Sequence, residues 1–496
     1  MNRRDFLKGL TAAGASLTLP VCFSVAADAS VYSGKRRTTN IIFIMTDDMA
    51  SWAYGAAPNG DAYTPNIDKL CSEAVSLENC YVTTPVCSPS RASLLTSRYS
   101  TEVGITDFIG SPKTGLDASF PAWPRFLAQA GYATALIGKW HLGEKDKFHP
   151  TQFGYDEFTG FRWGAKTSKD PMIEVQGEVQ QAKGYTPDIL TNHAIDFIRR
   201  RKDMAFMLSL HYWAPHCSTM GRTPDHRHTW LPLSDTDFSR YKGKALPLPD
   251  PDYPNLDKPA AERMMAEYLG AVASLDRNVG RLMNELDNLK LTDNTVVIFT
   301  SDNGYNIGHN GVEGKGNSEW VLKGNRSDRP NLYDNSLRVP AFIRWPVKIK
   351  PGISLDHTIT FLDWFPTLLA IAGLDTPKDK DIRGRNFLPL LMGKSIQWDN
   401  DLFAQYTMRG AGAMRMYKKG RWKLVRDFMH IIKDELYDLK TDPHEHINII
   451  DSPESEIQKQ RRLLNEKLLE KMLQINDPAL ALIKSDNEQE IKGEKI

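Results

Sequence analysis

The sequence predicts an α/β fold, in which a large, mostly parallel sheet is sandwiched by helices and a smaller C-terminal α+β subdomain contains an antiparallel sheet. Two observations carry this prediction. Short apolar, β-branched runs alternate with amphipathic helical patterns along most of the 496 residues, and such alternation is typical of parallel strands connected by helices. From about residue 396 short strand patterns follow one another instead, which indicates a second sheet.

The larger region begins with an apolar run at residues 40–45, which predicts a strand buried on both faces. Further strands are expected over residues 133–137, 205–210, 295–300 and 338–345. Helices are expected over residues 64–74, 90–97, 121–130, 187–199, 260–289 and 363–372. The helix from Pro187 is the best marked of these, because Thr186 precedes it as a cap and proline is favoured in a first helical turn.

The C-terminal region predicts three short antiparallel strands, over residues 414–419, 422–426 and 435–439, and a charged amphipathic helix over 454–473. We therefore divide the chain into an N-terminal segment, a catalytic domain and a C-terminal subdomain. Their expected bounds are residues 1–29, 30–395 and 396–496.

Composition excludes some classes of protein. The formal net charge is only +1, with 41% hydrophobic and 25% charged residues, so the bulk charge gives no sign of nucleic-acid binding and any anion must be recognised locally. The five cysteines include no CxxC pair that would indicate zinc. Cys71 and Cys80 could form a disulfide or remain as free, buried thiols.

The N-terminus resembles a twin-arginine export signal. Arg3 and Arg4, followed by Phe-Leu-Lys, precede a weakly apolar run to Ala27 with small residues for cleavage near Ala29. This predicts a periplasmic or secreted protein that the twin-arginine machinery exports; an ordinary signal peptide or an uncleaved anchor is the alternative. No other segment is apolar enough to span a bilayer, so no stable membrane insertion is expected.

Two acidic pairs follow predicted strands. Asp47 and Asp48 come after the strand at 40–45, and Asp302 and Asn303 after the strand at 295–300. Ligands of open α/β sheets bind at the carboxyl ends of the strands. Three carboxylates and an amide oxygen would suit Ca²⁺ or Mg²⁺ there, although the same residues could simply cap the helices that follow.

Cys87 opens the segment Cys-Ser-Pro-Ser-Arg, which reads as a turn entering a helix. A helix N-terminus favours an anion, and Arg91 would lie one turn along the helix, within reach of the same anion. As a bare pattern, a lone cysteine is more often a small buried residue.

Loops after other predicted strands carry cations and histidines. Lys139 and His141 lie two residues apart, and His211 and His216 follow the strand at 205–210. Lys315 belongs to a glycine-rich loop whose spacing is not that of a nucleotide-binding P-loop. Each loop alone could be structural; together they describe a site for a tetrahedral oxyanion ester.

With these motifs in place, the sequence resembles the type I, formylglycine-dependent sulfatases of the alkaline-phosphatase-like superfamily, and among them the bacterial carbohydrate sulfatases. The family signature Cys-x-Pro-x-Arg stands here at 87–91. Matching segments occur in family order from about residue 38 to 450, at residues 64–68, 138–143, 301–304 and 435–438.

The resemblance implies that Cys87 is oxidised to formylglycine, which requires a formylglycine-generating maturation enzyme. The aldehyde hydrates to a gem-diol; one hydroxyl attacks sulfur with Asp302 as the base, and the second allows sulfate to be expelled. A serine would lack that second hydroxyl. The implied metal is Ca²⁺ rather than Mg²⁺, and its implied ligands are Asp47, Asp48, Cys87, Asp302 and Asn303.

The remaining implied roles concern charge and proton transfer. Arg91, Lys139 and Lys315 neutralise the sulfate oxygens. His216, with Lys315, protonates the departing sugar oxygen, and His141 removes the proton from the second hydroxyl. His211 is the alternative to His216.

The substrate implied is a sulfated carbohydrate. Two departures from the family pattern, Glu313 in place of an aromatic residue and Ser218 in place of a proline, predict altered substrate contacts. Sugar rings could stack on aromatic residues that could equally lie in the core, namely Trp163, Tyr212, Trp213 and Trp320. The alternatives are a phosphoester or phosphonate hydrolase of the same superfamily and a catalytically silent protein that binds sulfated glycans.

Overall fold

A computed structural model describes residues 39–483, except for 59, 165–166, 219–226, 318, 324–329 and 431–432. The chain divides after residue 36, and its second unit, Arg37–Ile496, contains all of the described residues. The expected signal segment, 1–29, lies outside the described residues, and all that follows concerns the second unit. Among the described helices, none is long and apolar enough to cross a membrane.

The centre of the second unit is a ten-stranded sheet of order β13-β2-β12-β8-β1-β7-β3-β4-β5-β6. Its five central strands, β8 to β4 in this order, pair parallel, whereas β12, β5 and β6 run antiparallel to their neighbours. The strands are β13 Ile353–Thr360, β2 Val75–Tyr81, β12 Ala341–Arg344, β8 Thr295–Ser301, β1 Asn40–Thr46, β7 Phe206–His211, β3 Ala133–Lys139, β4 Glu157–Phe161, β5 Met172–Val175 and β6 Glu178–Gln181.

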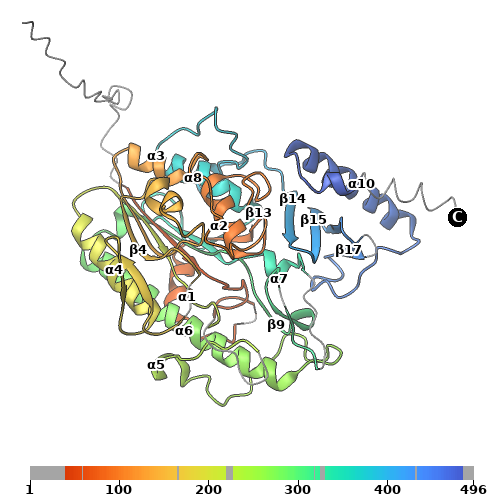
Figure 1. Cartoon of the computed structure of the whole chain (residues 1–496), viewed down its shortest axis with the longest axis horizontal. Helices are drawn as coiled ribbons and strands as arrows, with labels where there is room; N and C mark the ends of the chain where they lie inside the picture. The colour runs from red at the N-terminus through yellow and green to blue at the C-terminus, as the bar shows by residue number, and fades with distance from the viewer. Residues whose placement is uncertain are drawn as a thin grey trace, which may run out of the picture. The chain divides into compact units, whose positions relative to one another are not determined.

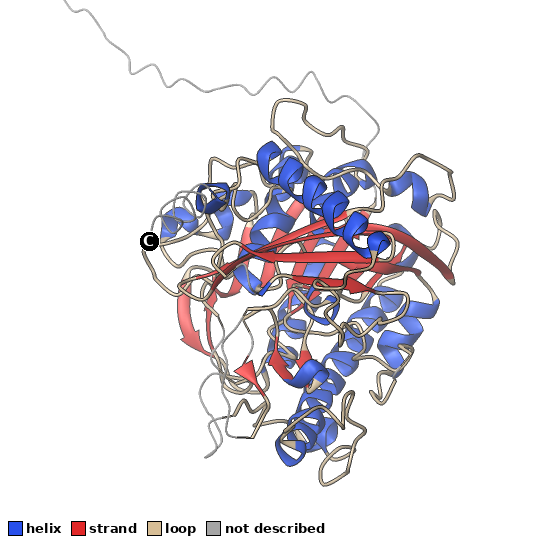
Figure 2. Cartoon of the chain, turned by 90° about the vertical axis from the view of Figure 1, so that its right-hand side faces the viewer, coloured by secondary structure: helices blue, strands red, loops and turns tan. Residues whose placement is uncertain are grey.

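Helices cover both faces of this sheet, as Figure 2 shows. β1 is buried on both faces: Ile41 and Phe43 belong to one hydrophobic core, and Ile42 and Ile44 to the other. The first core is closed by α2 Cys87–Thr96, α3 Trp123–Gln129 and α8 Trp364–Ile371. The second is closed by α1 Pro65–Ser72, α4 Thr186–Arg201 and α6 Lys258–Asn288. The predicted sandwich of a mostly parallel sheet between helices is confirmed.

The predicted C-terminal antiparallel sheet is also confirmed. It has four strands, β14 Leu402–Met408, β15 Gly412–Lys419, β16 Trp422–Asp427 and β17 Glu435–Asp438, in that order, and it lies with α10 Ser455–Gln474 beside the large sheet (Figure 1). Ala404 and Met416 belong to the first core, whereas Phe403 packs in a third cluster with Leu464 and Leu468 of α10. This alternation follows from the two-residue period of a strand.

The other elements are short. β9 Asn306–Ile307, β10 Val312–Gly314 and β11 Glu319–Trp320 form a three-stranded sheet after β8. The remaining helices of the described residues are the four-residue α5 Asp235–Phe238, α7 Asp334–Leu337 and α9 Leu388–Leu391, together with several 3₁₀ turns.

The structure corrects several element boundaries. The strand expected at 338–345 is reduced to β12, and the helix expected from Ser90 begins at Cys87. Pro89 fits there because a residue in the first helical turn needs no hydrogen bond from its nitrogen. Of the alternatives for the cysteines, the free thiols hold: Cys71 and Cys80 are unpaired, with Cys71 only half-buried.

A buried ion pair holds the chain after α10 against the C-terminal sheet. Arg415 donates from Nε and Nη2 to the two carboxylate oxygens of Asp477, at 2.6 and 2.7 Å. We predict that Asp477→Ala lowers the free energy of unfolding by about 3–5 kcal/mol, because it leaves a guanidinium buried without its partner. Denaturant unfolding measures this. Lys467→Ala, which removes an exposed pair with Glu470, is the control; equal unfolding midpoints for the two variants would contradict the prediction.

Candidate active site

The two acidic pairs meet because β1 and β8 are parallel neighbours. Thr46 pairs with Ser301, and the Asp302 amide donates to the Thr46 carbonyl at 3.0 Å. The acidic residues that follow the two strands therefore lie at the same edge of the sheet. Asp48 adopts a left-handed backbone conformation, with φ of 68°. Its carbonyl accepts a hydrogen bond from the Tyr268 hydroxyl at 2.9 Å, which fixes this turn.

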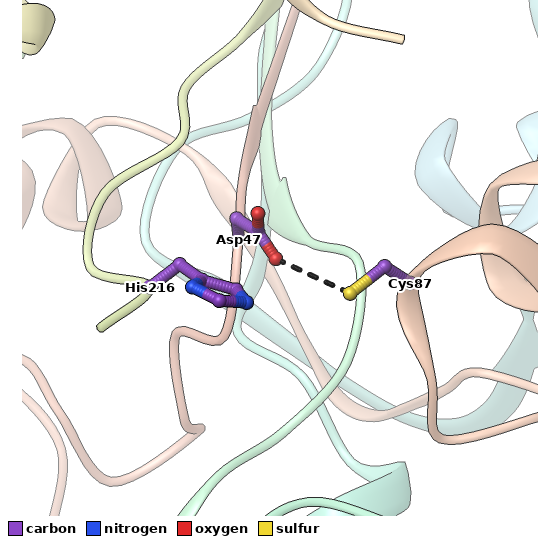
Figure 3. Close-up of side chains that lie close together, drawn as sticks. All are labelled: Asp47, Cys87 and His216. Carbon is purple, nitrogen blue, oxygen red and sulfur yellow. Dashed lines mark hydrogen bonds between the residues drawn. The ribbon is translucent and has the colours of Figure 1, made fainter. Parts of the chain in front are cut away.

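Cys87 lies opposite these acids as the first residue of α2. Its Sγ is 3.6 Å from Asp47 Oδ1 and 2.8 Å from Lys315 Nζ. Figure 3 shows the thiol pointing towards Asp47, with the His216 ring on the other side of that carboxylate. Burial raises the pKa of the Cys87 thiol to about 12, although Lys139 and Lys315 act in the opposite direction. The unmodified side chain is therefore a protonated thiol at neutral pH.

Each of the three carboxylates meets one buried cation. Asp47 pairs with Lys139, and Asp48 with Lys315. Asp302 accepts from Arg91 Nε at 2.8 Å. All six side chains are at most 8% exposed. The site therefore holds three positive and three negative charges that balance pairwise.

The pairing decides the protonation of these acids. Burial alone would raise all three pKa values. Burial is the largest single influence on Asp47 and Asp48, but Lys139, Lys315 and His216 together outweigh it for Asp47, and Lys315 and His216 together outweigh it for Asp48, so both pKa values lie below the usual range. For Asp302 burial and the charge of Asp47 prevail over Arg91, and the pKa is raised. Asp302 is thus the most basic carboxylate of the three.

Lys139 reaches the site from the end of β3 through a close approach of two strands. Gly138 pairs with His211 across β3 and β7, with φ of 117°. A Cβ at this position would lie 1.8 Å from the His211 carbonyl oxygen, so only glycine fits. Arg91 holds the same segment, because its Nη1 donates to the Lys139 carbonyl at 2.7 Å.

The three histidines lie in different places. His216 Nε2 is 3.7 Å from Asp48 Oδ2, and its Nδ1 is 2.8 Å from the Cys217 carbonyl. His211 instead directs Nδ1 to the Lys139 carbonyl at 3.3 Å. His141 is buried, and its Nδ1 has no hydrogen-bond partner in the described part of the chain. Burial lowers the pKa of all three imidazoles.

The expected aromatic contacts are only partly available. Trp213 is 2% exposed and packs beside His216, with ring centroids 6.0 Å apart, so it supports this histidine and offers no face to a sugar. Tyr212 is fully buried, so it belongs to the core, the other alternative for these aromatic residues. Trp163 and Trp320 are half-buried. Glu313 is fully buried and contacts His228, a residue that no sequence motif had singled out.

The acids form a set that fits a divalent cation. Oxygens of Asp47, Asp48 and Asp302 lie within 4.8 Å of one another. The Asn303 amide donates to Asp48 Oδ1 at 2.7 Å, while Asn303 Oδ1 is buried with no hydrogen-bond partner among the described residues. Buried polar atoms rarely stay unsatisfied. A hard cation with oxygen ligands, such as Ca²⁺ or Mg²⁺, would satisfy this atom.

Comparison with known proteins agrees with this fold and site. The model of the sulfatase family matches residues 39–374, and the chain therefore belongs to the sulfatase family. It is a sulfuric ester hydrolase. The model of the N-sulphoglucosamine sulphohydrolase C-terminal region matches residues 325–474. The model of the twin-arginine translocation signal matches residues 1–20, which confirms the predicted exported protein, periplasmic or secreted.

Several relatives share most of the chain. The N-acetylglucosamine-6-O-sulfatase of Bacteroides thetaiotaomicron is 29% identical over 93% of this chain and 92% of its own. Human N-acetylgalactosamine-6-sulfatase is 29% identical over 73% of this chain and 67% of its own. A protein solved in complex with its substrate D-glucosamine-2-N,6-O-disulfate has a TM-score of 0.74 at 26% identity, covering 89% of this chain and 99% of that one.

The oxygen set predicts stabilisation by a divalent cation. After removal of metal with a chelator, we expect saturating Ca²⁺ to raise the Tm by several degrees, because ligands that bind only the folded state stabilise it. Asp302→Asn should abolish most of this shift. Asp188→Asn, which alters an acid paired with Arg277 outside the site, should retain it. A full Ca²⁺ shift in Asp302→Asn would contradict the ligand set; thermal unfolding with and without Ca²⁺ measures it.

Proposed function

We propose that Cys87 is converted to formylglycine and that the mature protein removes sulfate from sulfated carbohydrates. The observation that carries the proposal is the position of Cys87 in the first turn of α2, where its Sγ lies 2.8 Å from Lys315 and 3.6 Å from Asp47. A nucleophile at this position faces three cations and an oxygen set for a metal. That combination suits an anionic ester whose charge must be neutralised during attack.

Two groups supply chemistry that the twenty side chains lack. A formylglycine aldehyde would provide, once hydrated, an oxygen nucleophile with a second hydroxyl on the same carbon, and a bound Ca²⁺ would provide a Lewis acid for the sulfate oxygens. Asp47, Asp48, Asp302 and Asn303 would hold the cation, and the residue at 87 would lie beside it. Mg²⁺ is the less suitable ion, because a site made of several carboxylates and an amide matches the larger, more flexible coordination of Ca²⁺.

The chain's own cations bind and orient the sulfate group. Lys315 presents an ammonium group beside Cys87, Lys139 presents another beside Asp47, and Arg91 adds a guanidinium. Arg91 Nη2 is buried and has no hydrogen-bond partner among the described side chains, so it keeps a donor for a sulfate oxygen. Arg91 remains anchored through Asp302 and the Lys139 carbonyl, which fixes the geometry before substrate arrives.

Histidines transfer the protons. His216 lines a pocket together with Asp48 and Lys315, and it directs Nε2 towards the acids because the Cys217 carbonyl holds Nδ1. It is placed to pass a proton from Lys315 through Nε2 to the departing sugar oxygen. His141 lies buried beside the cations, and burial with the charge of Lys139 keeps its pKa well below the usual value. A neutral imidazole there accepts the proton whose removal releases sulfate.

Maturation must precede folding. Cys87 is 3% exposed, so a formylglycine-generating enzyme cannot reach it in the folded chain. The twin-arginine machinery carries folded proteins. The two facts support a proposed order in which oxidation of Cys87 occurs first, then folding, then export.

We propose a 6-O-sulfated N-acetylhexosamine as the sugar that carries the sulfate. Support comes from two relatives, named for the 6-sulfates of N-acetylglucosamine and of N-acetylgalactosamine. The solved protein whose substrate is a glucosamine with a 6-O-sulfate adds to it. Steryl-sulfatases are also among the relatives, so the sugar is a matter for direct measurement.

Turnover of matched esters tests this function. We expect hydrolysis of 4-nitrophenyl sulfate, and of 6-sulfated N-acetylglucosamine or N-acetylgalactosamine with a higher kcat/KM, because the sugar adds contacts that the aryl group lacks. 4-Nitrophenyl phosphate should be hydrolysed at least about 100-fold more slowly, since the phosphate monoester is a dianion and carries one more negative charge past the three carboxylates than the sulfate monoanion does. Released sulfate or phosphate is measured by ion chromatography. Faster turnover of the phosphate would favour the phosphoester hydrolase.

A further inference from the structure

A pocket of about 440 Å³ continues from the reaction centre into a part of the chain that the chemistry above does not use. It is lined by Asp48, His216 and Lys315, and also by Ser218, His228 and Glu313. Because His216 faces the leaving oxygen, this space receives the sugar from which sulfate departs. The two departures from the family pattern, Ser218 and Glu313, both line it.

A buried carboxylate in this pocket orients an imidazole. Glu313 is 0% exposed, and its Oε1 lies 2.8 Å from His228 Nδ1. The same oxygen accepts from the His228 backbone amide at 3.2 Å, and Arg227 Nη1 lies 3.4 Å from Oε2. Burial alone would raise the pKa of Glu313, but these contacts with His228 hold it below the usual value. Glu313 is therefore ionised.

The contact with Glu313 favours one tautomer of His228. An ionised carboxylate 2.8 Å from Nδ1 attracts a hydrogen on that nitrogen, which leaves Nε2 for another partner. Nδ1 is buried, whereas the side chain as a whole is 23% exposed. The exposed part of the ring is therefore the part away from Glu313.

The backbone around His228 is held on several sides. Arg263 of α6 donates to the His228 carbonyl at 3.0 Å. Thr229 donates from Oγ1 to Glu267 Oε2 at 2.7 Å, and its carbonyl accepts from the Ser218 amide at 2.7 Å. A recognition group needs such support, because precise placement of a polar atom depends on the shell around it.

We propose that His228, oriented by Glu313, is a specificity-determining residue that hydrogen-bonds through Nε2 to a hydroxyl group of the sugar that carries the sulfate. His228 is a binding residue, and Glu313 acts through it as a positioning residue. This inference rests on the proposed function and names the side chains that select its substrate. A site built to hydrogen-bond a hydroxyl discriminates strongly against substrates that lack it.

The test compares a sugar sulfate with an aryl sulfate that has no ring hydroxyls. The sugar probe is whichever of 6-sulfated N-acetylglucosamine and 6-sulfated N-acetylgalactosamine the mature wild-type protein hydrolyses faster. We expect His228→Ala to lower kcat/KM for the sugar about tenfold, mainly through KM, because one substrate hydrogen bond is lost. Turnover of 4-nitrophenyl sulfate should stay within about twofold of wild type.

Two further variants and one control variant separate loss of sugar recognition from loss of folding. His228→Gln places an amide near the position of Nε2 and should recover part of the lost sugar turnover. Glu313→Gln removes the charge that orients the ring and should reproduce the selective loss of His228→Ala. His357→Ala, which removes a partly exposed histidine on β13, should behave as wild type with both esters. The Tm of each variant identifies any that is misfolded.

Each outcome decides between the proposals. Equal losses for both esters in His228→Gln, or no loss for the sugar in a folded His228→Ala, would overturn the role of His228 and leave the sulfatase intact. A wild-type protein that hydrolyses the aryl ester but neither sugar would overturn the proposed sugar and this role with it. Failure with every sulfate, in protein shown to carry formylglycine, would overturn the proposed function itself.

Discussion

Three buried ion pairs at the ends of β1, β3 and β8 are the constraint on which the site depends. A carboxylate removed from water loses several kcal/mol of solvation, and a buried cation beside it recovers this only with close geometry. Asp47, Asp48 and Asp302 each have such a cation. The pairing permits three acids within 4.8 Å of one another, and it also brings three cations to the place where an anionic ester reacts.

The fold supplies this arrangement through strand order. β1 lies between β8 and β7, and β3 follows β7, so one edge of the sheet collects the acids and Lys139. α2 covers the same edge and brings Cys87 and Arg91, four residues and one helical turn apart. Lys315 comes from the small sheet of β9 to β11, in the connection between β10 and β11 and immediately after β10. A single neutral cluster thus joins segments that are remote in sequence.

Much of this could be predicted from the sequence. The central strands are apolar and buried on both faces, so their pattern is unmistakable, and acids directly after two of them locate the sheet edge. The outer strands could not be found in this way: β6 is fully exposed and polar, and β2 mixes buried and exposed positions. The partners of each acid also escaped prediction, because Lys315 has no periodic pattern that ties it to Asp48.

The substrate side of the site was the least predictable. Trp213 has the large aromatic ring on which a sugar could stack, yet it is buried beside His216. The sequence could not predict this, because it does not reveal which face of a loop is covered. His228 lies in a segment with no strand or helix pattern. Its importance emerges only from Glu313, a carboxylate 85 positions away that contacts its amide and ring. Long-range pairs of this kind require the folded structure.

The most direct test of the account is the chemical identity of residue 87. Mass spectrometry of the peptide that contains Cys87, from protein produced together with a formylglycine-generating enzyme and assayed for sulfate release, measures it. The account predicts an aldehyde at residue 87 and activity in proportion to its fraction. Full activity in protein whose residue 87 is entirely unmodified cysteine would contradict it.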